Sequence, residues 1–185
     1  MTLKLITIKR THDDILKNMS NHYSQPKGFV GRNICYKITY NDVFYGCIVG
    51  GSSTKFLPGR NEYFDKELGA TWWHLENIVN NIFFHIEPVN GKYPIRNFAQ
   101  KVLTQFKDQI KKDWCYKYQN HVFGYETLIE LPRTGEIYLR NGWVKIGVTK
   151  GYTCKREGGL GTDSWSGKRV WNTTNLRPKL VLVTT

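Results

Sequence analysis

The stretch that decides the fold spans residues 124–149 and reads GYETLIELPRTGEIYLRNGWVKIGVT. Apolar and β-branched residues predict a strand at Val122–Leu131. A short turn then leads into one or two helical turns that carry Tyr138, and Asn141-Gly142 ends them. A second strand is predicted at Val144–Lys150. Few architectures place a tyrosine-bearing helical turn between two strands, so this order predicts an α/β fold.

The rest of the chain alternates between strand and helix patterns. A long polar connection, residues 50–70, and a Gly-, Ser- and Lys-rich stretch, residues 151–169, are predicted as loops. We therefore expect a single domain over residues 1–185, with a mixed central sheet of six or seven strands flanked by helices. Further strands are predicted at Leu3–Ile8, Arg32–Tyr40, Val43–Gly50, Ile78–Glu87 and Lys179–Val183, and helices after an N-cap at Thr11 and from Pro94 to about Tyr118.

The net charge of +12 is concentrated in two regions of the sequence. Residues 92–117 hold seven Lys or Arg against two acids, and residues 140–185 hold nine against two. The remaining residues sum to zero. Because Lys and Arg contacts to phosphates release counterions, this distribution favours a polyanionic partner such as DNA. A solvated basic surface is the alternative.

The cysteines and the N-terminus exclude several classes of protein. Cys35, Cys47, Cys115 and Cys154 form no C-x-x-C pair, so neither a zinc site nor a disulfide framework is indicated. The first ten residues contain two Lys and one Arg, unlike the apolar core of a secretory signal. No uncharged run approaches the ~20 residues of a membrane span. We expect a soluble intracellular protein that does not enter a membrane.

The segment Thr134-Gly135-x-Ile137-Tyr138-x-x-Asn141-Gly142-Trp143, followed by Gly147-x-Thr149, resembles phage Mom-type DNA modification proteins and the related Druantia-type domain. Its order of strand, short helix and strand is also similar to the last conserved segment of the Gcn5-related N-acetyltransferase (GNAT) fold. There a tyrosine on a short helix faces the thioester of acyl-CoA. The resemblance implies a GNAT-like sheet in which two central strands, here Ile78–Glu87 and Val122–Glu130, splay apart around the acyl group.

The resemblance also implies where a cofactor would lie. In the GNAT fold the helix after the central strand presents its N-terminal amides to the pyrophosphate of acetyl-CoA. The family's glycine-rich loop, Q/R-x-x-G-x-G/A, does not occur between Glu87 and Ala99, where Gly91 is the only glycine. Arg96-Asn97 instead matches an Arg-Asn step of Mom-like proteins. The implied cofactor-binding residues are thus Gly91, Arg96 and Asn97, and participation of a metal such as iron is left open.

Three residues are candidates for catalysis. By resemblance Tyr138 would donate a proton to the leaving thiolate or orient the acyl group, and Asn97 would line the reactive notch. Glu130, at the end of its strand, could act as a base or an anchor. The alternatives are a helix aromatic packed on the sheet for Tyr138 and a solvated strand end for Glu130. His74, beside Trp72-Trp73, is either a base or part of the packing.

Aromatic and basic residues in loop-like context are candidates for binding DNA. A base taken out of a duplex must stack on an aromatic side chain, and basic side chains hold the phosphates. A Lys-Arg step near Trp165 and Trp171 also resembles the end of Mom-like chains. The predicted substrate- and DNA-binding residues are Ser52, Lys55, Arg60, Trp72, Trp73, Lys168 and Arg169.

The function that this resemblance implies is modification of adenine in double-stranded DNA by an acyl or carbamoylmethyl-type transfer, which shields phage DNA from restriction. The expected location is the cytoplasm of a bacterial host. Two alternatives stay open. One is a conventional acetyl-CoA-dependent N-acetyltransferase, and the other is a noncatalytic DNA-binding defence module of the same fold.

Overall fold

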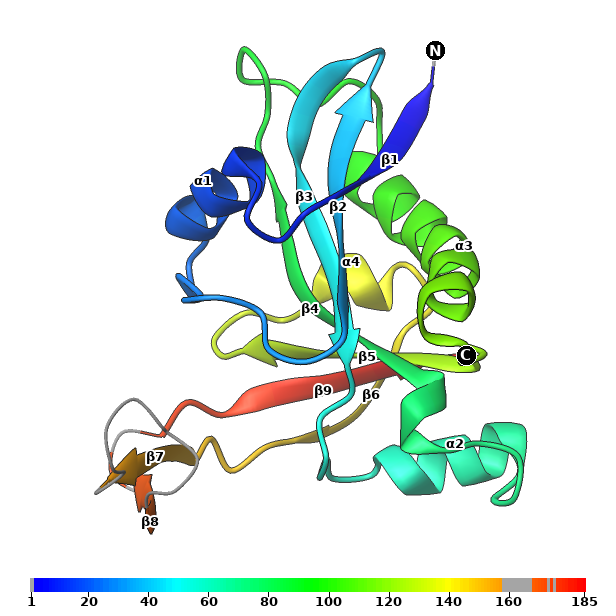
Figure 1. Ribbon diagram of the computed structural model, residues 1–185, viewed down its shortest axis with the longest axis vertical. Helices are drawn as coiled ribbons and strands as arrows, with labels where there is room; N and C mark the ends of the chain where they lie inside the picture. The colour runs from blue at the N-terminus through cyan, green and yellow to red at the C-terminus, as the bar shows by residue number, and fades with distance from the viewer. Residues whose placement is uncertain (1, 158–167, 173, 175) are drawn as a thin grey trace.

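The computed structural model describes residues 2–157, 168–172, 174 and 176–185. A seven-stranded mixed sheet in the order β1-β2-β3-β4-β5-β9-β6 forms the body of the molecule, and β7 and β8 form a separate two-stranded ribbon (Figure 1). The strands are β1 Leu3–Ile8, β2 Asn33–Tyr40, β3 Val43–Ser52, β4 Ile78–Ile86, β5 Gly124–Glu130, β6 Val144–Val148, β7 Thr153–Glu157, β8 Lys168–Asn172 and β9 Lys179–Thr184. The helices are α1 Asp13–Asn21, α2 Arg60–Leu68, the 3₁₀ turn η1 Leu75–Asn77, α3 Phe98–Tyr118 and α4 Glu136–Leu139.

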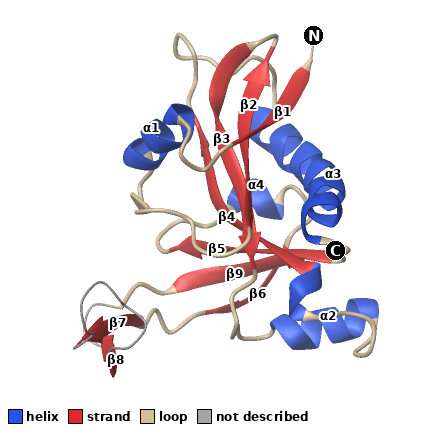
Figure 2. Cartoon of the chain, in the orientation of Figure 1, coloured by secondary structure: helices blue, strands red, loops and turns tan. Residues whose placement is uncertain are grey.

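Helices cover both faces of the sheet because β2 and β3 are apolar on both sides. Side chains of β2 alternate between two clusters: Tyr36 packs with Phe106 and other residues of α3, whereas Cys35 packs with Ile15 and Met19 of α1. Figure 2 shows α1 and α3 on opposite sides of these strands. The mixed sheet with flanking helices confirms the predicted fold class.

The strands predicted at Arg32–Tyr40 and Val43–Gly50 form a hairpin, β2 and β3, which turns at Asn41-Asp42. Both residues have positive φ, 49° and 63°, as a two-residue turn between right-twisted strands requires. The helix after β1 is also present, but its N-cap is His12 rather than Thr11. The Nδ1 atom of His12 accepts the backbone N–H of Asp14 at 3.2 Å.

Three other predictions along the chain were wrong. The long helix begins at Phe98 and not at Pro94, because Asn97 adopts a left-handed conformation with φ 58°. The polar stretch 50–70 is not all loop: it contains α2, whose start is marked by Gly59 at φ 71°. The stretch 151–169 likewise holds β7 and the start of β8.

The close packing of α3 on the sheet depends on a glycine in β3. A Cβ atom added to Gly50 would lie 2.0 Å from Cδ1 of Ile110 and 3.2 Å from the ring of Phe106. Both of these α3 side chains are fully buried. A larger residue at position 50 would therefore push the helix away from β3.

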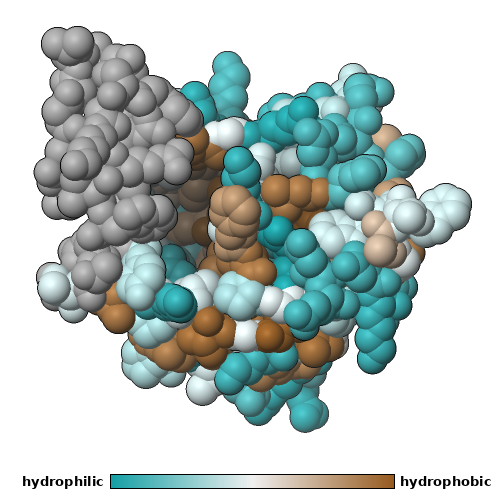
Figure 3. Space-filling model, turned by 90° about the horizontal axis from the view of Figure 1, so that it is seen from below, coloured by the Kyte–Doolittle hydropathy of each residue, from teal (hydrophilic) through white to brown (hydrophobic). Residues whose placement is uncertain are grey.

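At the opposite end of the sheet β6 pairs with β9 and with no other described strand. Val144 and Val148 of β6 are 46% and 42% exposed. Figure 3 shows the molecule from below, the end at which β6 and α2 lie in Figure 1, with apolar side chains set among hydrophilic ones.

Candidate active site

The two central strands diverge soon after they begin. β4 and β5 are parallel and pair only at Ile78↔Gly124, Val79↔Tyr125 and Asn80↔Glu126, although both strands continue beyond this point. A cavity of about 500 Å³ occupies the resulting notch. Its walls are mainly apolar side chains of β4, β5 and α4, and its rim carries His22, Tyr23, Glu130, Arg133, Glu136 and Lys179. The splayed pair predicted from the sequence is thus present.

The divergence starts at a β-bulge in β4. Val49 of β3 pairs with Phe83, but its neighbour Gly50 pairs with Asn81, so β4 has one extra residue, Ile82. A bulge bends its strand and interrupts the hydrogen-bond ladder. The side chain of Asn81 occupies the interruption: its Nδ2 donates to the backbone oxygens of Val49, at 3.1 Å, and Phe83, at 3.0 Å.

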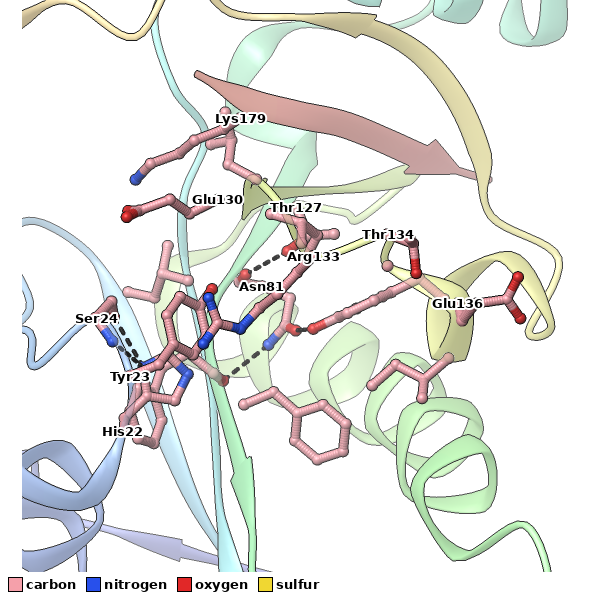
Figure 4. Close-up of a pocket in the computed structure, with 18 of the residues that line it drawn as sticks. His22, Tyr23, Ser24, Asn81, Thr127, Glu130, Arg133, Thr134, Glu136 and Lys179 are labelled. Atoms are coloured by element: carbon pink, nitrogen blue, oxygen red, sulfur yellow. Dashed lines mark hydrogen bonds between the residues drawn. The ribbon is translucent and has the colours of Figure 1, made fainter. Parts of the chain in front are cut away.

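Asn81 also connects the bulge to the far wall of the notch. Its Oδ1 accepts the hydroxyl proton of Tyr138 at 2.6 Å, and its backbone oxygen accepts the hydroxyl of Thr127 on β5 at 2.9 Å. Figure 4 shows Asn81 at the centre of these hydrogen bonds. Both Asn81 and Thr127 are buried. One amide side chain therefore links β3, β4 and α4 at the base of the notch.

Tyr138 both packs and lines the cavity. Its ring makes edge contacts with Trp143 and Phe84, with centroids 5.1 and 6.5 Å away, and the residue borders the notch. Burial raises the pKa of the phenol well above its ordinary value, so Tyr138 is protonated at neutral pH. A neutral phenol in this position can act as a proton donor.

The side of the notch nearest α1 is closed by residues that sequence patterns did not single out. The guanidinium of Arg133 lies 3.4 Å from the ring centroid of Tyr23, a cation–π contact between two loops. Beside it His22 is buried, and its Nδ1 accepts the backbone N–H of Ser24 at 3.2 Å. Burial, together with the charges of His85 and Arg133, lowers the pKa of His22 to about 4, so the imidazole is neutral at pH 7.

Glu130 and Lys179 face each other across β5 and β9 at the mouth of the notch. Figure 4 shows their side chains side by side. Within the described residues neither side chain forms an ion pair. A carboxylate and an ammonium group are therefore both available to a ligand at the mouth.

The predicted cofactor residues lie in the connection between β4 and α3. Gly91, with φ 73°, forms a tight turn with Asn90, and Val89 and Lys92 bridge across it. Arg96 and Asn97 are exposed just before α3, and Asn97 makes no side-chain cap on the helix. Asn97 borders a separate groove with Lys101 and Thr104, so the structure does not bring it into the notch with Tyr138 and Glu130.

Arg60, predicted to contact DNA, is buried instead. Its Nη1 lies 3.2 Å from Oε2 of Glu126 and also donates to the backbone oxygen of Thr54, while its Nη2 donates to that of Lys55. Glu126 is fully buried and its Oε1 accepts the backbone N–H of Thr54 at 2.7 Å. This ion pair anchors the β3–α2 connection to the start of β5, and the guanidinium is not available to a phosphate.

The other predicted DNA contacts have different environments. Trp72 is 76% exposed, whereas Trp73 is buried and its Nε1 donates to Asp65 at 2.9 Å. Ser52 and Lys55 are exposed. Lys168 and Arg169 belong to β8, whose side chains are outside the described part of the structure, and Trp165 lies outside the described residues. His74 is exposed and precedes η1.

The described residues contain no group of three or more His, Cys, Asp or Glu side chains arranged to hold a metal ion. They also contain no helix with the length and apolar character needed to cross a membrane.

Several solved structures have the same fold. An acetyltransferase from Bacillus subtilis in complex with CoA superposes with a TM-score of 0.57 at 10% identity, over 98% of this chain and 97% of that chain. A GNAT family acetyltransferase from Elizabethkingia anophelis with acetyl-CoA bound gives 0.53 at 11% identity, over 98% and 97%. An IAA acetyltransferase from Bacillus cereus gives 0.53 at 10% identity, over 99% of both chains.

Comparison of the sequence with protein-family models and with curated proteins gives no match. The structural likenesses, at identities this low, show the fold alone: the chain has a GNAT-like fold.

Proposed function

We propose that this protein is an acyltransferase that moves an acyl group from the thioester of an acyl-CoA, such as acetyl-CoA, to an amine. The observation that carries the proposal is the cavity between β4 and β5, which places a protonated phenol at the base of a largely apolar notch. Fold alone does not fix chemistry. The residues inside this notch are therefore the basis of the proposal.

The notch suits the pantetheine arm of an acyl-CoA, a narrow chain of alternating amide and apolar units. Among the described strands β4 has no partner on its β5 side beyond Asn80, so its backbone faces the cavity there. Apolar side chains from both strands line the remaining surface. Bound acyl-CoA supplies an acyl group activated as a thioester.

Tyr138 is the proposed proton donor. In the transfer, the acyl C–S bond breaks, a C–N bond to the amine forms, and the departing sulfur takes a proton. The phenol carries one proton at neutral pH, and in the structure it donates that proton to Oδ1 of Asn81, a bond that fixes its position relative to both strands. Donation to the sulfur would require the O–H bond to rotate toward the bound thioester, and the phenolate left behind would regain a proton from solvent. Asn81 is thus a positioning residue for Tyr138.

Glu130 is the proposed residue that binds and deprotonates the acceptor amine. Its carboxylate stands at the mouth of the notch without an ion-pair partner among the described side chains, so it can hold an ammonium group and accept the proton that the amine must lose before attack. Lys179 and Arg133 beside it favour acceptors that also carry negative charge.

The phosphate end of the donor would lie at the start of α3. The backbone N–H groups there have no side-chain cap, the first turn has no acidic residue, and Arg96 and Lys101 flank it. Since this connection contains the Asn90-Gly91 turn and not a glycine-rich loop, we expect weaker retention of the phosphates than the loop would give.

A nucleobase in DNA is the second candidate acceptor, favoured by the net charge of +12. An exocyclic amine such as that of adenine would enter the mouth after the base leaves the duplex. Exposed Trp72 and the exposed lysines of α3 are available to such a partner.

The test is an assay of thiol release from acetyl-CoA, with polyamines, amino acids and duplex DNA offered as acceptors and the products identified by mass spectrometry. We expect acylated product with the wild type and a loss of kcat of about 10²-fold or more in Tyr138→Phe. The matched control is Tyr125→Phe, because Tyr125 is equally buried and its hydroxyl donates to the backbone oxygen of Lys107 outside the notch.

Equal losses in the two phenylalanine variants would reject Tyr138 as the proton donor. No thiol release with any acceptor, in a protein that is folded, would reject the acyltransferase. Acylated adenine in the DNA arm would identify the second acceptor, and unmodified DNA with an acylated small amine would exclude it.

A further inference from the structure

A second cavity, of about 600 Å³, lies at the other side of the domain, between the end of β1, the start of β2 and the C-terminal turn of α3. It shares no lining residue with the notch. Its walls contain Lys9, Arg10 and Lys117, and none of the described residues that border it is acidic. We call it the basic pocket.

The basic pocket is built partly from cations that are held in place. The Nζ atom of Lys117 donates to the backbone oxygen of Asn33 at 3.1 Å, and Nη1 of Arg10 donates to that of Phe29 at 3.4 Å. The side chain of Lys9 is exposed and has no hydrogen-bond or ion-pair partner among the described residues. Arg10 and Lys117 are also exposed, but each already has a backbone partner beside the pocket.

Tyr118 fixes the wall on which these cations stand. Its hydroxyl accepts the backbone N–H of Asn33 and donates to the oxygen of the same residue, both at 2.9 Å. Its ring has Lys117 Nζ at 5.1 Å and the Arg32 guanidinium at 5.5 Å from the centroid. Arg32 also lies close to this wall, but its Nη1 atom is 3.8 Å from Oε2 of Glu76, so its charge is already paired.

The field of these charges reaches the floor of the basic pocket. Cys35 lies there, 2% exposed. Burial raises the pKa of its thiol to about 11, while the charges of Lys117 and Arg10 act in the opposite direction, as they do on any anion near the floor. Like charges gathered without a counter-charge repel each other, and an anion in the pocket would relieve that repulsion.

We propose that the basic pocket binds a phosphate group through Lys9, Arg10 and Lys117, with the hydroxyls of Thr7 and Thr11 at its edge. The phosphate has two sources with the same chemistry, the backbone of a nucleic acid or a small phosphorylated molecule. The proposal does not rest on acyl transfer, because the two cavities are separate.

The first experiment titrates inorganic phosphate into the folded protein and follows the backbone amide signals by NMR. We expect saturable shifts that cluster at residues of the basic pocket, with Gly31 and Cys35 among them. Lys9→Ala/Arg10→Ala should bind phosphate at least 10-fold more weakly. Lys9→Ala alone, which removes no described contact, should bind phosphate about 3-fold or more weakly. This single variant tests the proposal even if the double variant does not fold.

The matched control is Lys66→Ala/Lys145→Ala, which removes the same charge from two exposed positions outside the basic pocket. It should leave phosphate affinity within about 2-fold. Equal weakening in this control, or phosphate shifts that do not saturate or that spread over the surface, would overturn the proposal.

A second arm distinguishes the sources by measuring affinity for a short DNA duplex against salt concentration. If the phosphate comes from nucleic acid, the plot of log affinity against log salt concentration should be less steep by about 2 for the Lys9→Ala/Arg10→Ala variant, because each phosphate contact contributes about 0.9 to the steepness. An unchanged slope combined with lost phosphate binding supports the small phosphorylated ligand instead.

Discussion

The hydroxyl of Tyr138 lies 2.6 Å from Oδ1 of Asn81, and this hydrogen bond joins the tyrosine helix to the bulge that opens the sheet. The amide of Asn81 thereby has two roles. Its nitrogen donates hydrogen bonds to the backbone carbonyls of Val49 and Phe83 at the bulge, and its oxygen orients the phenol. The shape of the cavity and the position of the proposed proton donor thus depend on one side chain.

Replacing Asn81 should therefore destabilise the protein much more than replacing its neighbour. Asn81→Ala leaves two buried carbonyls and one phenol without these partners, which should lower the free energy of unfolding by about 3 kcal/mol. Asn80 is equally buried, but its amide makes only one described hydrogen bond, to Thr54 at 3.3 Å, and its Oδ1 makes none. Asn80→Ala should cost less than about 1 kcal/mol by urea unfolding. Similar losses in the two variants would contradict the role assigned to Asn81.

The buried imidazole of His22 should make stability depend on pH. Its pKa is about 4 in the folded protein and ordinarily 6.5, so between these values the unfolded chain binds more protons and stability falls as the pH falls. His22→Gln lacks this contribution. The difference in unfolding free energy between wild type and variant should therefore shrink from pH 7 to pH 4. Parallel curves over this range would refute the burial-induced shift.

The ion pair of Arg60 and Glu126 should matter through the charge left behind when one partner is removed. Arg60→Met leaves a fully buried carboxylate without its cation, at a cost of about 3–5 kcal/mol. Burial already raises the pKa of Glu126, and the single variant should raise it further. Arg60→Met/Glu126→Gln removes both charges and should recover much of the loss. A double variant as unstable as the single one would show that packing, not charge, dominates here.

Gly50 and Ile110 provide a test of the helix–sheet contact. Gly50→Ala brings a methyl group against Cδ1 of Ile110 and should cost about 1–3 kcal/mol. Ile110→Val removes that Cδ1 atom. In a double-mutant cycle the two changes should therefore compensate by about 1 kcal/mol or more. Additive losses would mean that β3 and α3 separate enough to make room without this contact.

The order of strands and helices could be predicted from the sequence because it depends on local patterns. The apolar run of β4, the Asn41-Asp42 turn and the tyrosine segment 134–143 each carry their own signal. The helix α2 was missed because it is short and mostly polar. The start of α3 was placed too early because Pro94 is compatible with a first helical turn, whereas the left-handed Asn97 is not evident from composition.

The site was predicted only in part, because long-range partners decide it. The sequence around Arg60 indicates an exposed cation in a loop. Its burial depends on Glu126, 66 positions away, which forms the ion pair in the interior. The role of Asn81 was not predicted, although an amide inside the apolar run of β4 is itself a sign of a special hydrogen-bonding role. His22 and Arg133 carry no local signal, since only the tertiary fold brings their loops to the rim.

The most direct test of the account is calorimetric titration of acetyl-CoA into the wild type and into a variant whose notch is filled. Leu128 lines the cavity, so Leu128→Trp should obstruct it, whereas Val144→Trp adds the same bulk on an exposed strand outside it. The account predicts saturable binding by the wild type and by Val144→Trp, and at least 10-fold weaker binding by Leu128→Trp. Equal affinity in all three proteins, or no binding by the folded wild type, would contradict it.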